Sequence, residues 1–263
     1  MTVQEALSAS GIDAREARLL LAEAAGFSQA SVLAHPEREL PSDVERRFLQ
    51  FTLRRGNGEP VAYIVGHKEF YGLDLIVNPA VLIPRPETEL LVDLALEREF
   101  SSLVDLGTGS GAVALAIKRR RPQARVVAVE ASAAALVVAQ RNAVKHGLEI
   151  EFRHGRWLEP LAGERFQLIV ANPPYVAEGD PHLGDLGFEP RGALVSGPDG
   201  LDAIREIARH APRHLAPGGW LLLEHGMGQE AAVRALLSQA GLEELDSCPD
   251  LARIPRVAGG KVK

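Results

Sequence analysis

The sequence predicts an α/β protein with an open sheet, preceded by a small helical domain and joined to it by a β-hairpin. Three observations support this prediction. Residues 1–58 carry apolar residues at helical spacing and no convincing strand, residues 59–84 hold two short strand patterns, and residues 85–263 alternate strand-like runs with helical segments. Because such alternation is typical of α/β folds, we expect three regions with these boundaries.

Composition and charge narrow the functional class. The chain has 263 residues, of which 46% are hydrophobic, and we expect a cytoplasmic protein because it shows no signal-peptide layout and no run of ~18 apolar residues. The single cysteine, Cys248, excludes an internal disulfide. The net charge of -6 weighs against direct nucleic-acid binding. The eight histidines lack ligand-type spacing, so no metal is expected.

The elements of the first two regions are predicted from the spacing of apolar residues and from the positions of glycine and proline. Helices are predicted over 13–25 and 44–53, and strands over 62–65 and 73–77. Pro86 suits the first position of a helix that runs to about residue 99. Arg85 lies between two prolines, so it should be held on a stiff loop just before that helix.

A nucleoside-binding unit follows. A strand over 103–106 precedes a glycine-rich loop and a helix, and a second strand over 125–129 ends at Glu130. The loop consists of Gly107, Thr108, Gly109, Ser110 and Gly111. An acidic residue at this distance can accept hydrogen bonds from a ribose diol, but the pattern alone does not separate NAD from another adenosine cofactor.

The later elements continue the alternation. A helix over 132–146 should stop at Gly147, and a strand is predicted over 149–153. Trp157 follows this strand, and its indole either flanks an adenine ring or fills the core. Further helices are predicted over 201–215 and 229–240, a strand over 219–224, and a last antiparallel pair over 242–245 and 253–257.

The stretch from Phe166 to Tyr175, FQLIVANPPY, carries the most specific signal. Its apolar run predicts a buried strand, which must end before the prolines because neither supplies an N–H to the ladder. Ligands bind at the carboxyl edge of open α/β sheets, and this edge receives Asn172, Pro173, Pro174 and Tyr175.

The combination of the two edge motifs resembles the S-adenosylmethionine-dependent methyltransferases that act on planar nitrogen. The segments LIPRPETELLVDLAL, DLGTGSGAVALAI, ANPPYV, EPRGAL, DGLD and LLLEHGMGQ are together similar to the HemK/PrmC group, over nearly the whole chain. The resemblance implies a Rossmann-like domain over 85–263 and methylation of the side-chain amide nitrogen of a glutamine. That glutamine would lie in the Gly-Gly-Gln loop of class I peptide chain release factors, recognised with the help of residues 1–58.

Site residues are implied at matching positions. The glycine loop and Glu130 would hold S-adenosyl-L-methionine, Trp157 would border its adenine, and Asn172 would lie beside both cofactor and substrate. Asn172, Pro173, Pro174 and Tyr175 would clamp the substrate amide, and Arg85 would belong to the same pocket. Glu189 and Pro190 match a family motif without a derived role. Glu130 stands where the family commonly has aspartate, and Arg156 replaces a residue that is often acidic.

The chemistry explains the choice of residues. A glutamine amide nitrogen is a poor nucleophile because its lone pair is delocalised, whereas the sulfonium methyl is already activated, so alignment is the enzyme's main task. If Asn172 Oδ1 and the Pro173 carbonyl each accept one amide hydrogen, both donors are satisfied, and Tyr175 packs on the flat amide.

Three other functions use parts of the same pattern. An adenine-N6 DNA methyltransferase would present the same planar amino group, but it needs a basic recognition domain that this sequence lacks. An NAD-dependent oxidoreductase would use the glycine loop and leave Asn172 to Tyr175 unexplained. A protein that only binds the cofactor would have no reason to keep Asn172.

Overall fold

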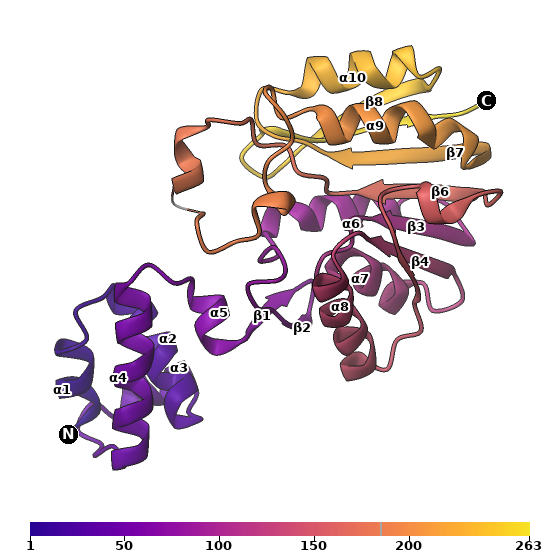
Figure 1. Cartoon of the computed structure of the whole chain (residues 1–263). Helices are drawn as coiled ribbons and strands as arrows, with labels where there is room; N and C mark the ends of the chain where they lie inside the picture. The colour runs from indigo at the N-terminus through magenta and orange to yellow at the C-terminus, as the bar shows by residue number, and fades with distance from the viewer. Residues whose placement is uncertain (185) are drawn as a thin grey trace. The chain divides into compact units, whose positions relative to one another are not determined.

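The computed structural model describes residues 1–184 and 186–263, and the chain forms two compact units, Met1–His67 and Lys68–Lys263 (Figure 1). Each unit has its own cluster of buried apolar side chains. None of the helices that the structure describes has the length and apolar character needed to cross a bilayer.

The first unit is helical throughout its described length. It contains α1 (Val3–Ser8), α2 (Ala14–Ala25), α3 (Gln29–Ala34), α4 (Ser42–Gly56) and α5 (Val61–Val65). The Asp13 carboxylate accepts hydrogen bonds from the first N–H groups of α2, and Gly26 ends this helix with a left-handed backbone. Leu20, Leu21 and Phe48 lie in its core.

The strand predicted over 62–65 is wrong, because these residues belong to helix α5. Pro60, with φ of -59°, precedes the helix, and Gly66 ends it in the left-handed region. A run of five apolar residues fits a buried helical turn as well as a strand, so periodicity could not separate them. The hairpin follows this helix, as β1 (His67–Phe70) and β2 (Leu73–Ile76), which confirms the strand predicted over 73–77.

The second unit is built on a mixed sheet that has seven strands within the described residues, in the order β5-β4-β3-β6-β7-β9-β8. The strands are β3 (Ser102–Leu106), β4 (Arg125–Glu130), β5 (Glu151–His154), β6 (Phe166–Ala171), β7 (Leu215–Glu224), β8 (Glu243–Pro249) and β9 (Pro255–Lys261). The first five are parallel and β9 is antiparallel to both neighbours. The strand order reverses between β3 and β6, which makes a ligand crevice at their carboxyl ends.

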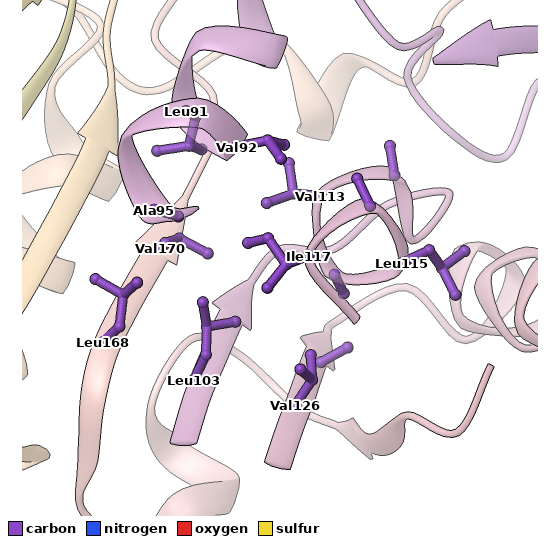
Figure 2. Close-up of a cluster of buried hydrophobic side chains, with 14 of the residues drawn as sticks. Leu91, Val92, Ala95, Leu103, Val113, Leu115, Ile117, Val126, Leu168 and Val170 are labelled. Carbon is purple, nitrogen blue, oxygen red and sulfur yellow. The ribbon is translucent and has the colours of Figure 1, made fainter. Parts of the chain in front are cut away.

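Helices cover both faces of this sheet. They are α6 (Glu89–Leu96), α7 (Ala112–Arg120), α8 (Ala133–His146), α9 (Asp202–His210) and α10 (Glu230–Gln239). Figure 2 shows how Leu91 and Ile117, from α6 and α7, meet Leu103 and Leu168 of the sheet. Apolar residues of α9 and α10 pack on the other face, which is why these strands are continuously hydrophobic. The predicted α/β class with a Rossmann-like sheet is therefore confirmed.

Candidate active site

A cavity of about 690 Å³ lies in the second unit and opens at the carboxyl ends of β3, β4 and β6. Nine of the residues predicted for the site line it: Arg85, Gly107, Thr108, Gly109, Ser110, Glu130, Trp157, Asn172 and Pro174. Gly111, Pro173 and Tyr175 do not line its wall. Gly111 packs against α7 and α8, Pro173 is buried, and Tyr175 is half-buried behind the turn.

The glycine loop turns tightly between β3 and α7. Gly107, Gly109 and Gly111 have φ of 71°, 56° and 85°, a left-handed conformation that favours glycine. Glu130 fixes the loop, because its Oε2 accepts the Gly109 N–H at 2.8 Å and its Oε1 accepts the Ser132 N–H at 2.9 Å. A carboxylate can accept about four hydrogen bonds, so Glu130 can still accept hydrogen bonds from the two hydroxyl groups of a diol.

Asp105 lies beside the glycine loop and was not among the site residues predicted from the sequence. It is 2% exposed, and its Oδ2 accepts hydrogen bonds from the Thr108 hydroxyl at 2.6 Å and from the Ala114 N–H at 3.3 Å. Burial raises the pKa of Asp105 to about 6, while these hydrogen bonds act in the opposite direction. Asp105 thus ties the glycine loop to the first turn of α7.

Trp157 forms part of the cavity wall beside the glycine loop. It has φ of 47°, which is unusual for a bulky residue, and its Nε1 is buried without a hydrogen-bond partner among the described residues. The ring contacts Gly107, since a Cβ at this glycine would lie 2.9 Å from Trp157 Cζ3. The indole also packs against the core, as one of the two predictions for this residue expects, while a role beside adenine stays a prediction.

This contact predicts a defect in Gly107→Ala. The added methyl group should push the indole away from the cavity wall, and we expect the dissociation constant of the cofactor predicted from the sequence, S-adenosylmethionine, to rise at least about tenfold in isothermal titration. Gly147→Ala is the matched control, because Gly147 has a similar φ of 62° and nothing within 4 Å of its Cβ position. Equal affinities in the two variants would contradict a role for this contact.

The Asn-Pro-Pro-Tyr turn follows β6 and is held from two sides. The Asn172 amide donates through Nδ2 to Thr88 Oγ1 at 3.0 Å. The Tyr175 carbonyl accepts from Gln229 Nε2 at 3.0 Å, and Gln229 Oε1 accepts from the Gly226 N–H at 2.8 Å. Burial raises the pKa of the Tyr175 phenol to about 12, so this hydroxyl keeps its proton.

Gly200 allows this close packing. A Cβ there would lie 2.2 Å from the Tyr175 carbonyl oxygen and 2.8 Å from Gln229 Nε2. Gln229 Nε2 also reaches the Asp199 carbonyl at 3.3 Å. The DGLD and GMGQ segments therefore support the backbone of the turn.

Glu189 acts in the same way on the loop that carries Arg85. Its buried carboxylate pairs with the Arg85 guanidinium and accepts the Ile83 N–H at 3.1 Å. Removing either partner would leave a buried charge or a backbone donor without its partner. The motif that had no derived role thus fixes the entrance loop of the cavity.

The arrangement suits a ligand with an adenosine part on one side and a planar polar group on the other. Glycines without Cβ atoms, an acceptor at Glu130, an indole at Trp157 and the amide of Asn172 all line the same cavity. A cavity at the switch point of an open α/β sheet is where proteins of this fold bind nucleotide-containing ligands.

The class is that of the methyltransferases. Residues 86–184 match the family model described as methyltransferase small domain, and residues 2–66 match the PrmC N-terminal domain. The fold is shared with a methyltransferase from Pyrococcus furiosus, at a TM-score of 0.58 and 16% identity, covering 81% of this chain and 98% of that one. It is also shared with a T. Thermophilus 16S rRNA N2 G1207 methyltransferase, at 0.57 and 23%, covering 75% of this chain and 50% of that one.

More similar sequences identify the family. A release factor glutamine methyltransferase from Xylella fastidiosa is 51% identical over 95% of this chain and 94% of its own length, and one from Burkholderia pseudomallei is 48% identical over 99% and 96%. The chain belongs to the release factor glutamine methyltransferase family. It is an enzyme that methylates a glutamine of release factors, which confirms the function predicted from the sequence.

Proposed function

We propose that the enzyme binds S-adenosyl-L-methionine in the cavity and transfers its methyl group to the side-chain nitrogen of the glutamine in the Gly-Gly-Gln loop of class I release factors. The observation that carries this proposal is a single cavity lined by both the glycine loop with Glu130 and the amide of Asn172. The proposed cofactor site and the Asn172 side chain that would hold the substrate amide therefore belong to the same cavity.

The residues fit this cofactor. Gly109 has open space around its Cβ position, Glu130 retains acceptor capacity for ribose hydroxyls, and the Trp157 ring offers a flat apolar surface to adenine. The cofactor, when bound, supplies an activated methyl group on a positively charged sulfur. The volume of about 690 Å³ suits a ligand of this size.

The chain's own task is to orient the acceptor. Asn172 Oδ1 and the Pro173 carbonyl would accept the two amide hydrogens of glutamine, and Tyr175 would pack beside it. Because the two prolines restrict the backbone, little conformational entropy is lost when the amide binds. Holding nitrogen, methyl carbon and sulfur in line is the main catalytic contribution.

The helical unit would recruit the rest of the release factor. It has its own core and matches the PrmC N-terminal domain model over residues 2–66. On its surface Leu49 and Leu53, one turn apart on α4, are 58% and 60% exposed. These two side chains would offer a small apolar contact surface to the release factor.

A transfer assay with methyl-labelled cofactor tests the function. It offers a purified release factor, its Gly-Gly-Ala variant, a peptide containing only the Gly-Gly-Gln loop, and unmethylated duplex DNA, followed by mass spectrometry. We expect label on the intact factor, none on the variant, and weaker labelling of the peptide at equal concentration. Label on DNA alone would overturn the assignment in favour of adenine, and equal labelling of peptide and factor would contradict recruitment by the helical unit.

A further inference from the structure

Glu224 is a buried acid that the proposed function does not use. It ends β7, and its residue is 2% exposed. The preceding residue, Leu223, pairs with Ala171 of β6, so Glu224 lies beside the position where Asn172 leaves the sheet. Its Oε2 has no hydrogen-bond partner among the described residues. A buried carboxyl group in this state requires an explanation beyond packing.

Two hydroxyl groups connect this acid to the Asn-Pro-Pro-Tyr turn. The hydroxyl groups of Thr88 and Tyr175 lie close enough to the Glu224 carboxyl group to lower its pKa. Thr88 is 4% exposed, and its Oγ1 is also the partner of Asn172 Nδ2, at 3.0 Å. The acid therefore neighbours both ends of the turn, because Thr88, the hydrogen-bond partner of Asn172, and Tyr175 both act on its carboxyl group.

A hydroxyl group has one proton, which determines the orientation of the Asn172 amide. If the Thr88 proton points to an ionised Glu224, the Thr88 oxygen can only accept, and it must face the NH2 side of Asn172. Oδ1 of Asn172 is then left for the substrate. With the opposite orientation two acceptor oxygens would face each other, and the NH2 group of Asn172 would face the NH2 group of glutamine.

We propose that Thr88 and the ionised carboxylate of Glu224 are positioning residues that fix the Asn172 amide with Oδ1 toward the substrate. This inference rests on the proposed function, in which Asn172 clamps the glutamine amide. The inference adds Thr88 and Glu224 as the residues that stabilise only one orientation of the Asn172 amide. Neither residue receives a proton from the substrate or donates one to it.

The arrangement makes turnover depend on pH. Burial raises the pKa of Glu224 to about 7, the facing Glu87 carboxylate raises it as well, and Arg256 of β9 and the two hydroxyls lower it. A protonated carboxyl group can donate to the Thr88 oxygen, which frees the Thr88 proton to point at Asn172 Oδ1. Both amide orientations are then satisfied, so the fraction of competent enzyme falls as the pH is lowered through this pKa.

The test compares kcat between pH 5.5 and 9, a range set by about two units around such a pKa, in the wild type, Thr88→Val, Thr88→Ser and Glu224→Gln. We expect Thr88→Val, which has the same shape without the hydroxyl, to lose about ten- to hundredfold in kcat. Its cofactor affinity should change little. Thr88→Ser should restore most of the turnover. Glu224→Gln, which cannot ionise, should behave at every pH like the wild type at low pH.

A second measurement observes the amide without substrate. The side-chain NH2 resonance of Asn172, assigned by its loss in Asn172→Ala, should shift with pH through the titration of Glu224 in the wild type and stay constant in Thr88→Val and Glu224→Gln. The pKa of Asp105 is raised to about 6, so Asp105 also titrates in this pH range. Its titration should be the same in Thr88→Val and Glu224→Gln as in the wild type, which distinguishes it from the titration of Glu224.

The outcomes separate this inference from the proposed function. Wild-type kcat and pH profile in Thr88→Val, together with an inactive Asn172→Ala, would overturn the role of Thr88 and Glu224 and leave the clamp in place. An active Asn172→Ala would overturn the clamp itself. An Asn172 resonance that ignores pH in the wild type would contradict the link to Glu224 whatever the substrate is.

Discussion

Asn172→Ala is expected to lower kcat for release-factor methylation by about 10²–10³-fold, the size of effect seen when one oriented hydrogen-bonding group is removed from a reacting centre. The substrate amide loses one of its two acceptors and rotates freely about the remaining one. Cofactor affinity should stay within a few-fold, because the glycine loop and Glu130 are unchanged. Single-turnover kinetics and isothermal titration measure the two quantities.

The matched control removes an amide elsewhere. Gln140 lies exposed on α8, away from the residues that line the cavity, and Gln140→Ala should retain wild-type kcat. Near wild-type turnover in Asn172→Ala would sink the clamp. A loss of cofactor affinity equal to the loss of kcat would instead place Asn172 mainly in the cofactor site.

Glu130→Gln should weaken cofactor binding by about 10- to 100-fold, since hydrogen bonds to a charged group contribute about 1.5–3 kcal/mol. Both oxygens of Glu130 accept backbone N–H groups, from Gly109 and Ser132. A glutamine has one acceptor oxygen, so its NH2 group would face one of these donors. The glycine loop would lose its anchor, and the ribose hydroxyls would lose a charged acceptor.

Glu130→Asp is the informative partner variant. It keeps both acceptor oxygens on a shorter side chain, so its cofactor affinity should lie well above that of Glu130→Gln. Titration calorimetry compares the two at one pH. Wild-type affinity in Glu130→Gln would remove Glu130 from the proposed cofactor site.

The sequence was sufficient for the βαβ core because strand, glycine loop and helix are local patterns. Ser132 does begin α8 as its N-cap, and Gly147 ends it in the left-handed region. Helix α5 was missed since five apolar residues do not define a period. The predicted helix ending near residue 99 stops at Leu96, and α9 is shorter than predicted because a 3-10 turn at Ala211–Arg213 follows it.

The supporting residues of the site could not be predicted in the same way. Thr88 is far in the chain from Glu224 and Gln229, and each of the three acts through a contact that only the folded sheet creates. The one available signal was an acid at the end of an apolar strand, Glu224 after LLL, where a buried charge needs a reason. The rule that ligands bind at the carboxyl edge of the sheet predicted where the two motifs lie, but it did not predict the residues that support them.

The position of β9 affects how the molecule reaches its active form. Strand β8 precedes β9 in the chain but joins the sheet only through it, because β9 lies between β7 and β8. Strand β9 must therefore pair with β7 before or together with β8, and this pairing brings Val257 beside Glu224 and the Arg256 carbonyl onto the His225 N–H. The acid becomes fully enclosed only at that step. Late, long-range pairing of this kind is slow compared with local folding, so the methyl-transfer site is expected to be among the last parts of the chain to mature.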